Sequence, residues 1–362
     1  MKKEPLNRLT VMVTDDCNLS CKGCVTDAQD GKQGKRTIDS DFVSKVLSKY
    51  GQNFIDSQTG LLYLFFSGRG EPTLRMDVIE GIYQRAGEMH GLENLYVGIQ
   101  TNTVFDERTR KRISDISDVV WVSVDGAPQE NDAIRKYGRR LRMAGKTGGS
   151  SEYVTRNTKA LREDGIDVRM RSTIHRSNIG KQKDLVDYAT SLEVETVVAE
   201  PAIRSPSLSG TGSIYLVDLD EFVDRFIEAN NYAEQLGVRY TTGLMEEAQK
   251  LVNPCARRCG ECFSIDVKTE LPRSATLTTD NRLAGCYLGY EDSLKMQSLT
   301  FGRWENGAVV IDREKLGELT QAYREQKGCH GRALTGDAEI NPQLLKTLFY
   351  RAKFPTEMPK HP

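Results

Sequence analysis

The 362-residue chain has only four histidines, almost no net charge and no long apolar run. Its 50 lysines and arginines balance 51 aspartates and glutamates. Nucleic-acid-binding proteins usually carry a basic surface, so this balance argues against that class. No stretch approaches the roughly 20 apolar residues of a membrane span, and residues 1–8 lack the apolar core of a signal peptide. We therefore expect a cytoplasmic protein with no membrane or nucleic-acid partner.

Cysteine is absent from the long central part of the chain and clustered towards both ends. Three cysteines stand within eight residues near the start, and five stand between residues 255 and 329. In a reducing compartment, clustered cysteines indicate metal or redox chemistry more often than disulfides. The distribution therefore predicts two metal or redox sites.

Apolar runs of strand length alternate with segments of helical periodicity up to about residue 236. This alternation predicts βαβ units and a parallel sheet. Six repeats suit a partial or complete barrel, with its chemistry at the carboxyl ends of the strands. The expected strands are 9–14, 61–67, 95–101, 119–124, 167–174 and 196–202. The expected helices are 39–50, 75–90, 107–116, 151–164, 181–192 and 218–236.

The remaining segments predict loops and a second, smaller unit. Residues 138–150 are basic and glycine-rich without periodicity, which indicates a mobile loop, and residues 204–212 predict another loop. A hairpin is expected over 274–286, with its turn at Thr279-Asp-Asn. We expect an α/β chain of two units, a barrel over 1–245 and a cysteine-rich domain over 246–362.

The first cysteine group, Cys17-x3-Cys21-x2-Cys24, follows the first expected strand, at the mouth of the expected barrel. Three thiolates in one short loop select an iron–sulfur cluster or zinc. Three cysteines leave one iron of a four-iron cluster without a protein ligand, and an open iron can bind a small molecule. No histidine stands nearby to complete a zinc site. The spacing favours iron–sulfur, and zinc completed by a distant residue is the alternative.

The segment from Thr14 to Cys24, TDDCNLSCKGC, resembles the signature of radical S-adenosylmethionine (radical SAM) enzymes. The resemblance implies that Cys17, Cys21 and Cys24 hold a [4Fe–4S] cluster whose fourth iron chelates S-adenosylmethionine (SAM). An electron from the cluster then cleaves SAM, and the 5′-deoxyadenosyl radical abstracts hydrogen from substrate. Gly23 departs from the signature, because the family usually has an aromatic residue there.

Further motifs at the expected strand ends resemble the SAM-binding motifs of this family. Ser67-Gly-Arg-Gly-Glu-Pro72 is similar to the Gly-Gly-Glu-Pro motif, whose backbone receives the SAM amino group. Gln100-Thr-Asn102 and Ser123-Val-Asp-Gly126 are similar to the motifs of the third and fourth strands. Tight turns, helix caps and surface ion pairs are the alternative roles. Arg135 and Arg171 are cations that could pair with the SAM carboxylate by a charge-assisted bond. The expected SAM contacts are Gly68, Gly70, Glu71, Asn102, Ser123, Arg135 and Arg171.

The second cysteine group, Cys255-x3-Cys259-x2-Cys262 with Cys286 and Cys329, surrounds the expected hairpin. This arrangement resembles the SPASM and twitch domains, in which an auxiliary [4Fe–4S] cluster lies away from the SAM cluster. Five cysteines fit one auxiliary cluster and leave one to spare, and Cys255 is the weakest ligand. A structural zinc knuckle is the alternative. The expected auxiliary ligands are Cys259, Cys262, Cys286 and Cys329.

We therefore expect a partial (β/α)6 barrel with a C-terminal SPASM/twitch-like domain, and a radical SAM enzyme. The resemblance implies a peptide or protein substrate, modified by a crosslink, a thioether, epimerisation or oxidation. It also implies an electron donor of the flavodoxin or ferredoxin type. The alternatives are a radical SAM dehydrogenase of a small molecule, such as an aminoglycoside precursor, and a non-catalytic zinc protein.

If both clusters form, anaerobically purified protein should be brown and hold about eight irons, and the triple variant of Cys17, Cys21 and Cys24 to alanine about four. Cys255→Ala should keep its iron, whereas Cys286→Ala should lose part or all of the second cluster, because it removes an expected ligand. Iron and zinc analysis of each variant provides the check. Zinc instead of iron in the triple variant would make the C-terminal module structural.

Overall fold

The computed structural model describes residues 2–24, 28, 36–202, 216–245, 273–285, 299–325 and 342–353. The loop expected over 204–212 lies outside these residues. So do all five cysteines of the second group, Cys255, Cys259, Cys262, Cys286 and Cys329. The expected auxiliary cluster and its ligands therefore stay predictions.

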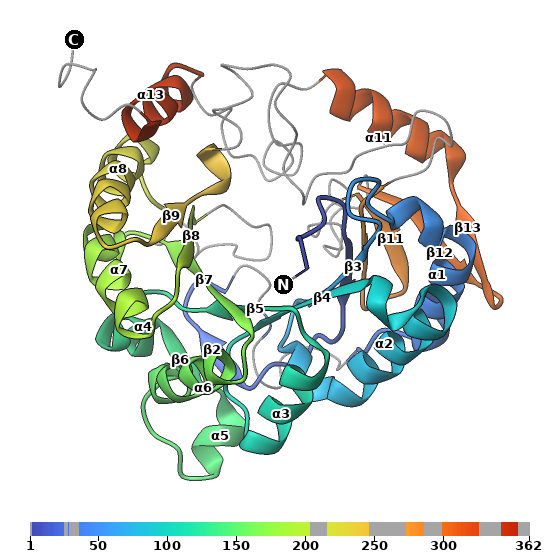
Figure 1. The fold of residues 1–362 in the computed structure, drawn as a ribbon, viewed down its shortest axis with the longest axis horizontal. Coiled ribbons are helices and arrows are strands. Elements are labelled where there is room, and N and C mark those ends of the chain that lie inside the picture. The colour runs from blue at the N-terminus through green and yellow to red at the C-terminus, as the bar shows by residue number, and fades with distance from the viewer. Residues whose placement is uncertain are drawn as a thin grey trace.

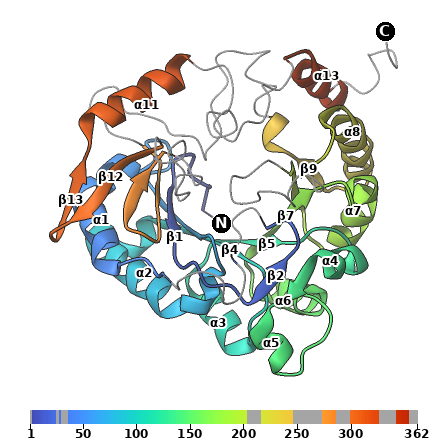
Figure 2. The ribbon, with the colours of Figure 1, turned by 180° about the vertical axis from the view of Figure 1, so that it is seen from behind.

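A curved sheet with helices around its outer face forms most of the described structure (Figures 1 and 2). Its strand order is β13-β12-β11-β10-β1-β3-β4-β5-β7-β8-β9, and neighbours are parallel from β10 through β1 to β9. Six central strands match those expected, which confirms the partial (β/α)6 barrel. They are β1 (Leu9–Met12), β3 (Leu62–Ser67), β4 (Leu95–Thr101), β5 (Val119–Ser123), β7 (Asp167–Ile174) and β8 (Thr196–Pro201).

The main helices of the barrel follow these strands where the sequence predicts them. Asp39, Asp106 and Asp218 begin three of them as N-caps, because each carboxylate accepts a backbone N–H of the first turn. The helices are α1 (Ser40–Phe54), α2 (Met76–His90), α3 (Glu107–Ile116), α6 (Ser151–Glu163), α7 (Gln182–Ser191) and α8 (Leu219–Gln235). Short 3-10 turns are η1 (Pro72–Arg75), η2 (Leu92–Asn94) and η3 (Ile179–Lys181).

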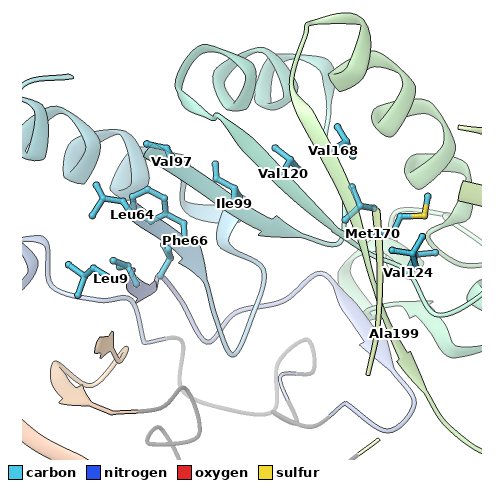
Figure 3. Packing of buried hydrophobic residues seen from close by; sticks show 14 of the residues in the cluster. Leu9, Leu64, Phe66, Val97, Ile99, Val120, Val124, Val168, Met170 and Ala199 are labelled. Atoms are coloured by element: carbon cyan, nitrogen blue, oxygen red, sulfur yellow. The ribbon is translucent and has the colours of Figure 1, made fainter. Parts of the chain in front are cut away.

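The side chains of each strand point alternately to the two faces of the sheet, and both faces are packed. Leu64 and Phe66 belong to the large core beneath the helices, together with residues of the neighbouring strands such as Val97 (Figure 3). Tyr63 and Tyr96 belong to a smaller cluster, because successive side chains point to opposite faces. Their ring centroids lie 4.9 Å apart, edge to face. The concave face of the sheet is therefore also packed.

The start of the chain crosses this concave face, near the centre of the barrel in Figure 1. Lys2 Nζ donates to the carbonyl oxygen of Leu95 at 2.6 Å, and Glu4 pairs with Arg169 at 2.6 Å. The guanidinium of Arg8 lies 4.7 Å from the centre of the Phe65 ring. These contacts fix residues 2–8 against the strands β3, β4 and β7, whereas the cysteine loop follows the carboxyl end of β1.

The structure contains several short helices and strands that the sequence analysis does not predict. β2 (Leu19–Cys21) pairs antiparallel with β6 (Arg135–Tyr137), and β9 (Arg239–Thr241) extends the parallel sheet beyond β8. α4 (Pro128–Ile134) precedes β6, and α5 (Arg139–Met143) is helical within the segment expected to be a loop. Among the described helices, none is long and apolar enough to span a membrane.

The described part of the expected second domain continues the barrel sheet. β10 (Ala275–Leu277) lies parallel to β1, and the expected hairpin joins it to β11 (Arg282–Ala284). β12 (Thr300–Glu305) and β13 (Ala308–Ile311) extend the sheet, followed by α11 (Arg313–Glu325). α13 (Pro342–Lys353) contacts α8 through an ion pair of Arg351 and Asp224 at 2.6 Å. The division between 245 and 246 stays a prediction.

Leu64→Ala should lower the free energy of unfolding by about 2–5 kcal/mol, because it opens a cavity beneath the helices. Leu64 has no exposed surface. Met143→Ala is the control, because Met143 is 76% exposed and its loss should change stability by less than about 0.5 kcal/mol. Urea unfolding followed by circular dichroism provides the measurement. Equal midpoints for the two variants would contradict this assignment of the core.

Candidate cluster and SAM site

The first cysteine group lies in the loop after β1, where the sequence predicts it. Asn18 anchors this loop, because its Nδ2 donates to the carbonyl oxygen of Val104 at 2.8 Å and its own carbonyl accepts from Gly138 N at 2.8 Å. The β2–β6 pairing then places Cys21 opposite Arg135. Cys17, Cys21 and Cys24 are half-buried, and none forms a disulfide.

The surroundings of the thiols disfavour isolated thiolates. Burial raises the pKa of Cys17 well above its usual value, and the charge of Cys21 raises it further. Burial also raises the pKa of Cys21 to about 12, although the nearby charge of Arg135 opposes this shift. Metal ligation requires deprotonated thiols, so a bound cationic centre would supply the missing stabilisation.

The donor set fits a four-iron cluster with one open iron, because it offers three thiols and no fourth cysteine in the loop. As placed, no three cysteine, histidine or carboxylate side chains of the described residues stand close enough to hold a metal ion. A four-iron cluster binds each cysteine at a different iron, so it does not require three side chains to meet at one metal ion. The loop that carries them spans only eight residues, from Cys17 to Cys24.

Asn102, at the end of β4, lies directly beside the cysteine loop. Its Nδ2 donates to Asn18 Oδ1 at 2.7 Å and to Cys17 Sγ at 3.9 Å. Its Oδ1 accepts from Val104 N at 2.9 Å, which fixes the orientation of the amide. Donors around a ligand sulfur tune a metal centre, so Asn102 is placed to influence a cluster at Cys17.

Glu71 fixes the backbone of Asn102 through a hydrogen bond. Its carboxylate accepts four hydrogen bonds, from the backbone N–H and hydroxyl of Thr73, the hydroxyl of Thr101 and the backbone N–H of Asn102. Burial raises the pKa of Glu71, and these hydrogen bonds oppose that shift. The bonds give the carboxylate a positioning role that the sequence did not reveal. Its expected direct contact with SAM stays a prediction.

The two glycines of the turn after β3 approach the backbone that leads into the cysteine loop. Gly70 N donates to the carbonyl of Thr14 at 3.0 Å, and Glu71 N donates to that of Asp16 at 2.7 Å. A Cβ on Gly70 would lie 1.9 Å from the carbonyl oxygen of Asp16, and one on Gly68 would lie 3.3 Å from that of Thr14. The sequence predicts a close backbone approach at these glycines, and the structure shows one. The backbone that they approach is the segment that leads into the cysteine loop.

Ser123 and Arg171 form a second group with Gln100, which joins the two. Gln100 Nε2 donates to Ser123 Oγ at 3.4 Å, and Arg171 Nη1 donates to Gln100 Oε1 at 3.3 Å. β5 and β7 place Ser123 and Arg171 in register as direct neighbours. This row lies across the three adjacent strands β4, β5 and β7 of the barrel. The sequence identified its two outer members and missed the central role of Gln100.

Arg135 supplies a buried positive charge beside the cysteine loop. Its Nη1 donates to Asp125 Oδ2 at 3.0 Å, and Asp125 Oδ1 accepts from Thr173 N at 2.9 Å. Burial disfavours its charged form, but the negative charges of Cys21 and Asp125 outweigh burial and raise the pKa. Its buried Nε has no hydrogen-bond partner within the described part of the chain. This cation is placed to stabilise negative charge on the cysteine ligands.

Gly70→Ala should displace the cysteine loop, because the added Cβ collides with the backbone at Asp16. We expect a loss of stability of about 1–3 kcal/mol and a lower iron content at the first site. Gly81→Ala is the matched control, because a Cβ there meets no atom within 4 Å among the described residues and lies in helix α2. Thermal unfolding and iron analysis check this. Wild-type iron content in Gly70→Ala would refute the role given to this contact.

Comparison with known proteins gives one family model and several solved structures of similar fold. Residues 7–145 match a family model described as a 4Fe-4S single cluster domain. No curated protein sequence matches the chain. The solved structure of native anSMEcpe with bound AdoMet (SAM) has 15% identity and a TM-score of 0.66, over 96% of this chain and 97% of that one.

Two peptide complexes are also similar. Native anSMEcpe with bound AdoMet and Kp18Cys peptide has 16% identity and a TM-score of 0.67, over 97% of this chain and 98% of that one. Streptococcus suis SuiB bound to precursor peptide SuiA has 14% identity and a TM-score of 0.56, over 80% and 61%. The chain therefore has the fold of these proteins, and its residues 7–145 are similar to a 4Fe-4S single cluster domain.

Proposed function

We propose that this protein is a radical SAM enzyme that modifies a peptide or protein. The observation that carries the proposal is the position of the three-cysteine loop. It follows β1 of a barrel similar to AdoMet-bound structures, with Asn102 at Cys17 and Arg135 opposite Cys21. The polar row of Gln100, Ser123 and Arg171 on the adjacent strands supports the proposal, because it offers hydrogen-bonding groups and a cation to a charged small molecule.

In this proposal Cys17, Cys21 and Cys24 hold the cluster, which when bound supplies the electron that cleaves SAM. The SAM contacts proposed are Gly68, Gly70, Glu71, Asn102, Ser123, Arg135 and Arg171. The role proposed for each of these residues follows from the residues around it. Arg135 and Arg171 offer cations to a carboxylate, and the turn at Gly68 offers backbone polar groups. Glu71 fixes the end of β4, and the packed barrel core limits water beneath the site.

The substrate class rests on the neighbours. Two anSMEcpe structures are named for bound Cp18Cys and Kp18Cys peptides, and one SuiB structure for its precursor peptide SuiA. We infer a peptide or protein substrate for this chain by analogy with them. An auxiliary cluster at Cys259, Cys262, Cys286 and Cys329 and a flavodoxin- or ferredoxin-type donor belong to the same proposal.

Anaerobic protein incubated with SAM, dithionite and candidate peptides should release 5′-deoxyadenosine, which chromatography measures. A product lighter by two hydrogens would identify an oxidation or crosslink. The Cys17→Ala, Cys21→Ala and Cys24→Ala variants should each lose SAM cleavage, because each removes one of the three cluster ligands. Cys255→Ala serves as the control, because it removes a cysteine that is not part of this loop in the sequence.

Full 5′-deoxyadenosine release by the triple cysteine variant would end the radical SAM proposal. Turnover of an aminoglycoside precursor but of no peptide would replace the peptide class by the small-molecule class. A colourless protein that holds zinc would replace both by a structural metal protein.

A further inference from the structure

The turn of the C-terminal hairpin lies against the segment that leads into the first cysteine loop. Thr279 Oγ1 donates a hydrogen bond of 2.6 Å to Asp15 Oδ1, across 264 residues of sequence. Asp15 stands two residues before Cys17. Thr279 is only 3% exposed and Asp15 only 5%. A hydrogen bond to a buried carboxylate is stronger than one between neutral groups, so this contact holds two distant parts of the chain together.

The other oxygen of Asp15 is also bound. Its Oδ2 accepts from Arg36 Nε at 2.8 Å, and Asp15 N donates to the carbonyl oxygen of Arg36 at 2.9 Å. The same carbonyl accepts from Thr14 Oγ1 at 3.0 Å. Both carboxylate oxygens and the backbone therefore fix Asp15, and only the bond to Oδ1 comes from the C-terminal hairpin.

The hairpin turn is itself held in place from two sides. Asn281 Oδ1 accepts from Asp39 N, at the start of α1, at 3.0 Å. The carbonyl of Asn281 accepts from Trp304 N of β12 at 3.0 Å. Asp280 lies 4.0 Å from Arg36 Nη1, so it adds a second attraction to the same arginine. The turn can therefore act on Asp15 as a fixed support.

Asp15 in turn supports the approach to the cysteines. The carbonyl groups on either side of it, of Thr14 and Asp16, accept the backbone N–H groups of Gly70 and Glu71. Arg140 pairs with the Asp16 carboxylate and lies 3.4 Å from the Cys17 carbonyl oxygen. A shift at Asp15 would therefore reach both the turn after β3 and Cys17.

We propose that the hairpin turn Thr279-Asp280-Asn281 is part of the first cysteine site, and that Asp15 is the positioning residue through which it acts. The C-terminal unit would then set the geometry of the loop that holds the SAM cluster. This inference rests on the proposed function wherever it concerns a cluster. The hydrogen bonds to Asp15 are made by protein groups alone, so their effect on the loop can also be measured in iron-free protein.

The test uses substitutions that separate the hydroxyl from the shape of the side chain. Thr279→Val keeps the shape and removes the donor, whereas Thr279→Ser keeps the donor. Thr300→Val is the matched control, because its buried hydroxyl has no hydrogen-bond partner in the described part of the chain. Asp15→Asn is a second variant, which keeps an acceptor for Thr279 and removes the charge that Arg36 binds.

The first measurement is the rate at which iodoacetamide alkylates Cys17, Cys21 and Cys24 in anaerobic, iron-free full-length protein, mapped by peptide mass spectrometry. Loss of a hydrogen bond to a charged group should raise the local opening of the loop, and with it the rate, about tenfold in Thr279→Val. Thr279→Ser and Thr300→Val should react at nearly the wild-type rate. Asp15→Asn should react faster than wild type.

The second measurement is the electron paramagnetic resonance spectrum of the reduced, reconstituted protein with and without SAM. Thr279→Val should alter the SAM-dependent change of the spectrum and raise the KM for SAM more than it lowers kcat. Thr279→Ser should restore both. A merely stabilising contact would lower the unfolding midpoint without altering the spectrum, and that result would overturn the inference.

Equal alkylation rates in Thr279→Val and wild type would also overturn the proposed role of the hairpin turn. So would an alkylation rate in Thr300→Val raised as much as that in Thr279→Val. Failure of the proposed function gives a different pattern. Wild-type protein that releases no 5′-deoxyadenosine would refute radical SAM catalysis, while the alkylation rates would still decide the role of Thr279.

Discussion

Two backbone hydrogen bonds hold the site together, from Gly70 N to the carbonyl of Thr14 and from Glu71 N to that of Asp16. They join the loop after β1 to the turn after β3, and they require a glycine at position 70 because no Cβ fits there. Through Glu71 the same contact reaches the end of β4 and Asn102. Three neighbouring strand ends are thus fixed relative to one another, and the cysteines stand on the first of them.

The site concentrates buried charge, which is costly unless each charge is paired. Glu71 meets this cost with hydrogen-bond donors alone, whereas Arg135 and Asp125 meet it as an ion pair. The thiols of Cys17 and Cys21 are only partly compensated for an ionised state. Burial raises both pKa values, and the charge of Arg135 at Cys21 and the backbone N–H of Leu19 at Cys17 only partly offset it. The loop is therefore better suited to bind a positively charged centre than to exist as free thiolates.

The sequence predicted the barrel closely, since the six strands and six helices have strong periodicity and clear ends. Asp39 and Asp106 mark helix starts by a local signal, the N-cap. The β2–β6 pair was not predictable, because Leu19–Cys21 is three residues long and carries no period. The contact of Gly70 with Asp16 was not predictable from the sequence either. The Asp16 carbonyl that leaves no room for a Cβ on Gly70 belongs to a loop over fifty residues away.

The candidate site was predictable in its residue types and less so in its connections. The motif pattern identified Asn102 and Arg135, because both stand at positions that the resemblance marks. The roles of Asp15 and Gln100 depend on contacts with Thr279 and Arg171, which are distant in sequence. The auxiliary cysteines lie outside the described residues, so their assignment stays a prediction.

The pairing of β1 with β10 also bears on how the chain folds. β1 begins at Leu9 and its register partner is Ala275, so one side of the first strand is covered only after most of the chain has been synthesised. Contacts of such long sequence range form late, because the loop that they close is entropically costly. Until then the edge of β1 is open to pairing with other strands. The segment that carries the first cysteines would thus reach its final support among the last events of biosynthesis.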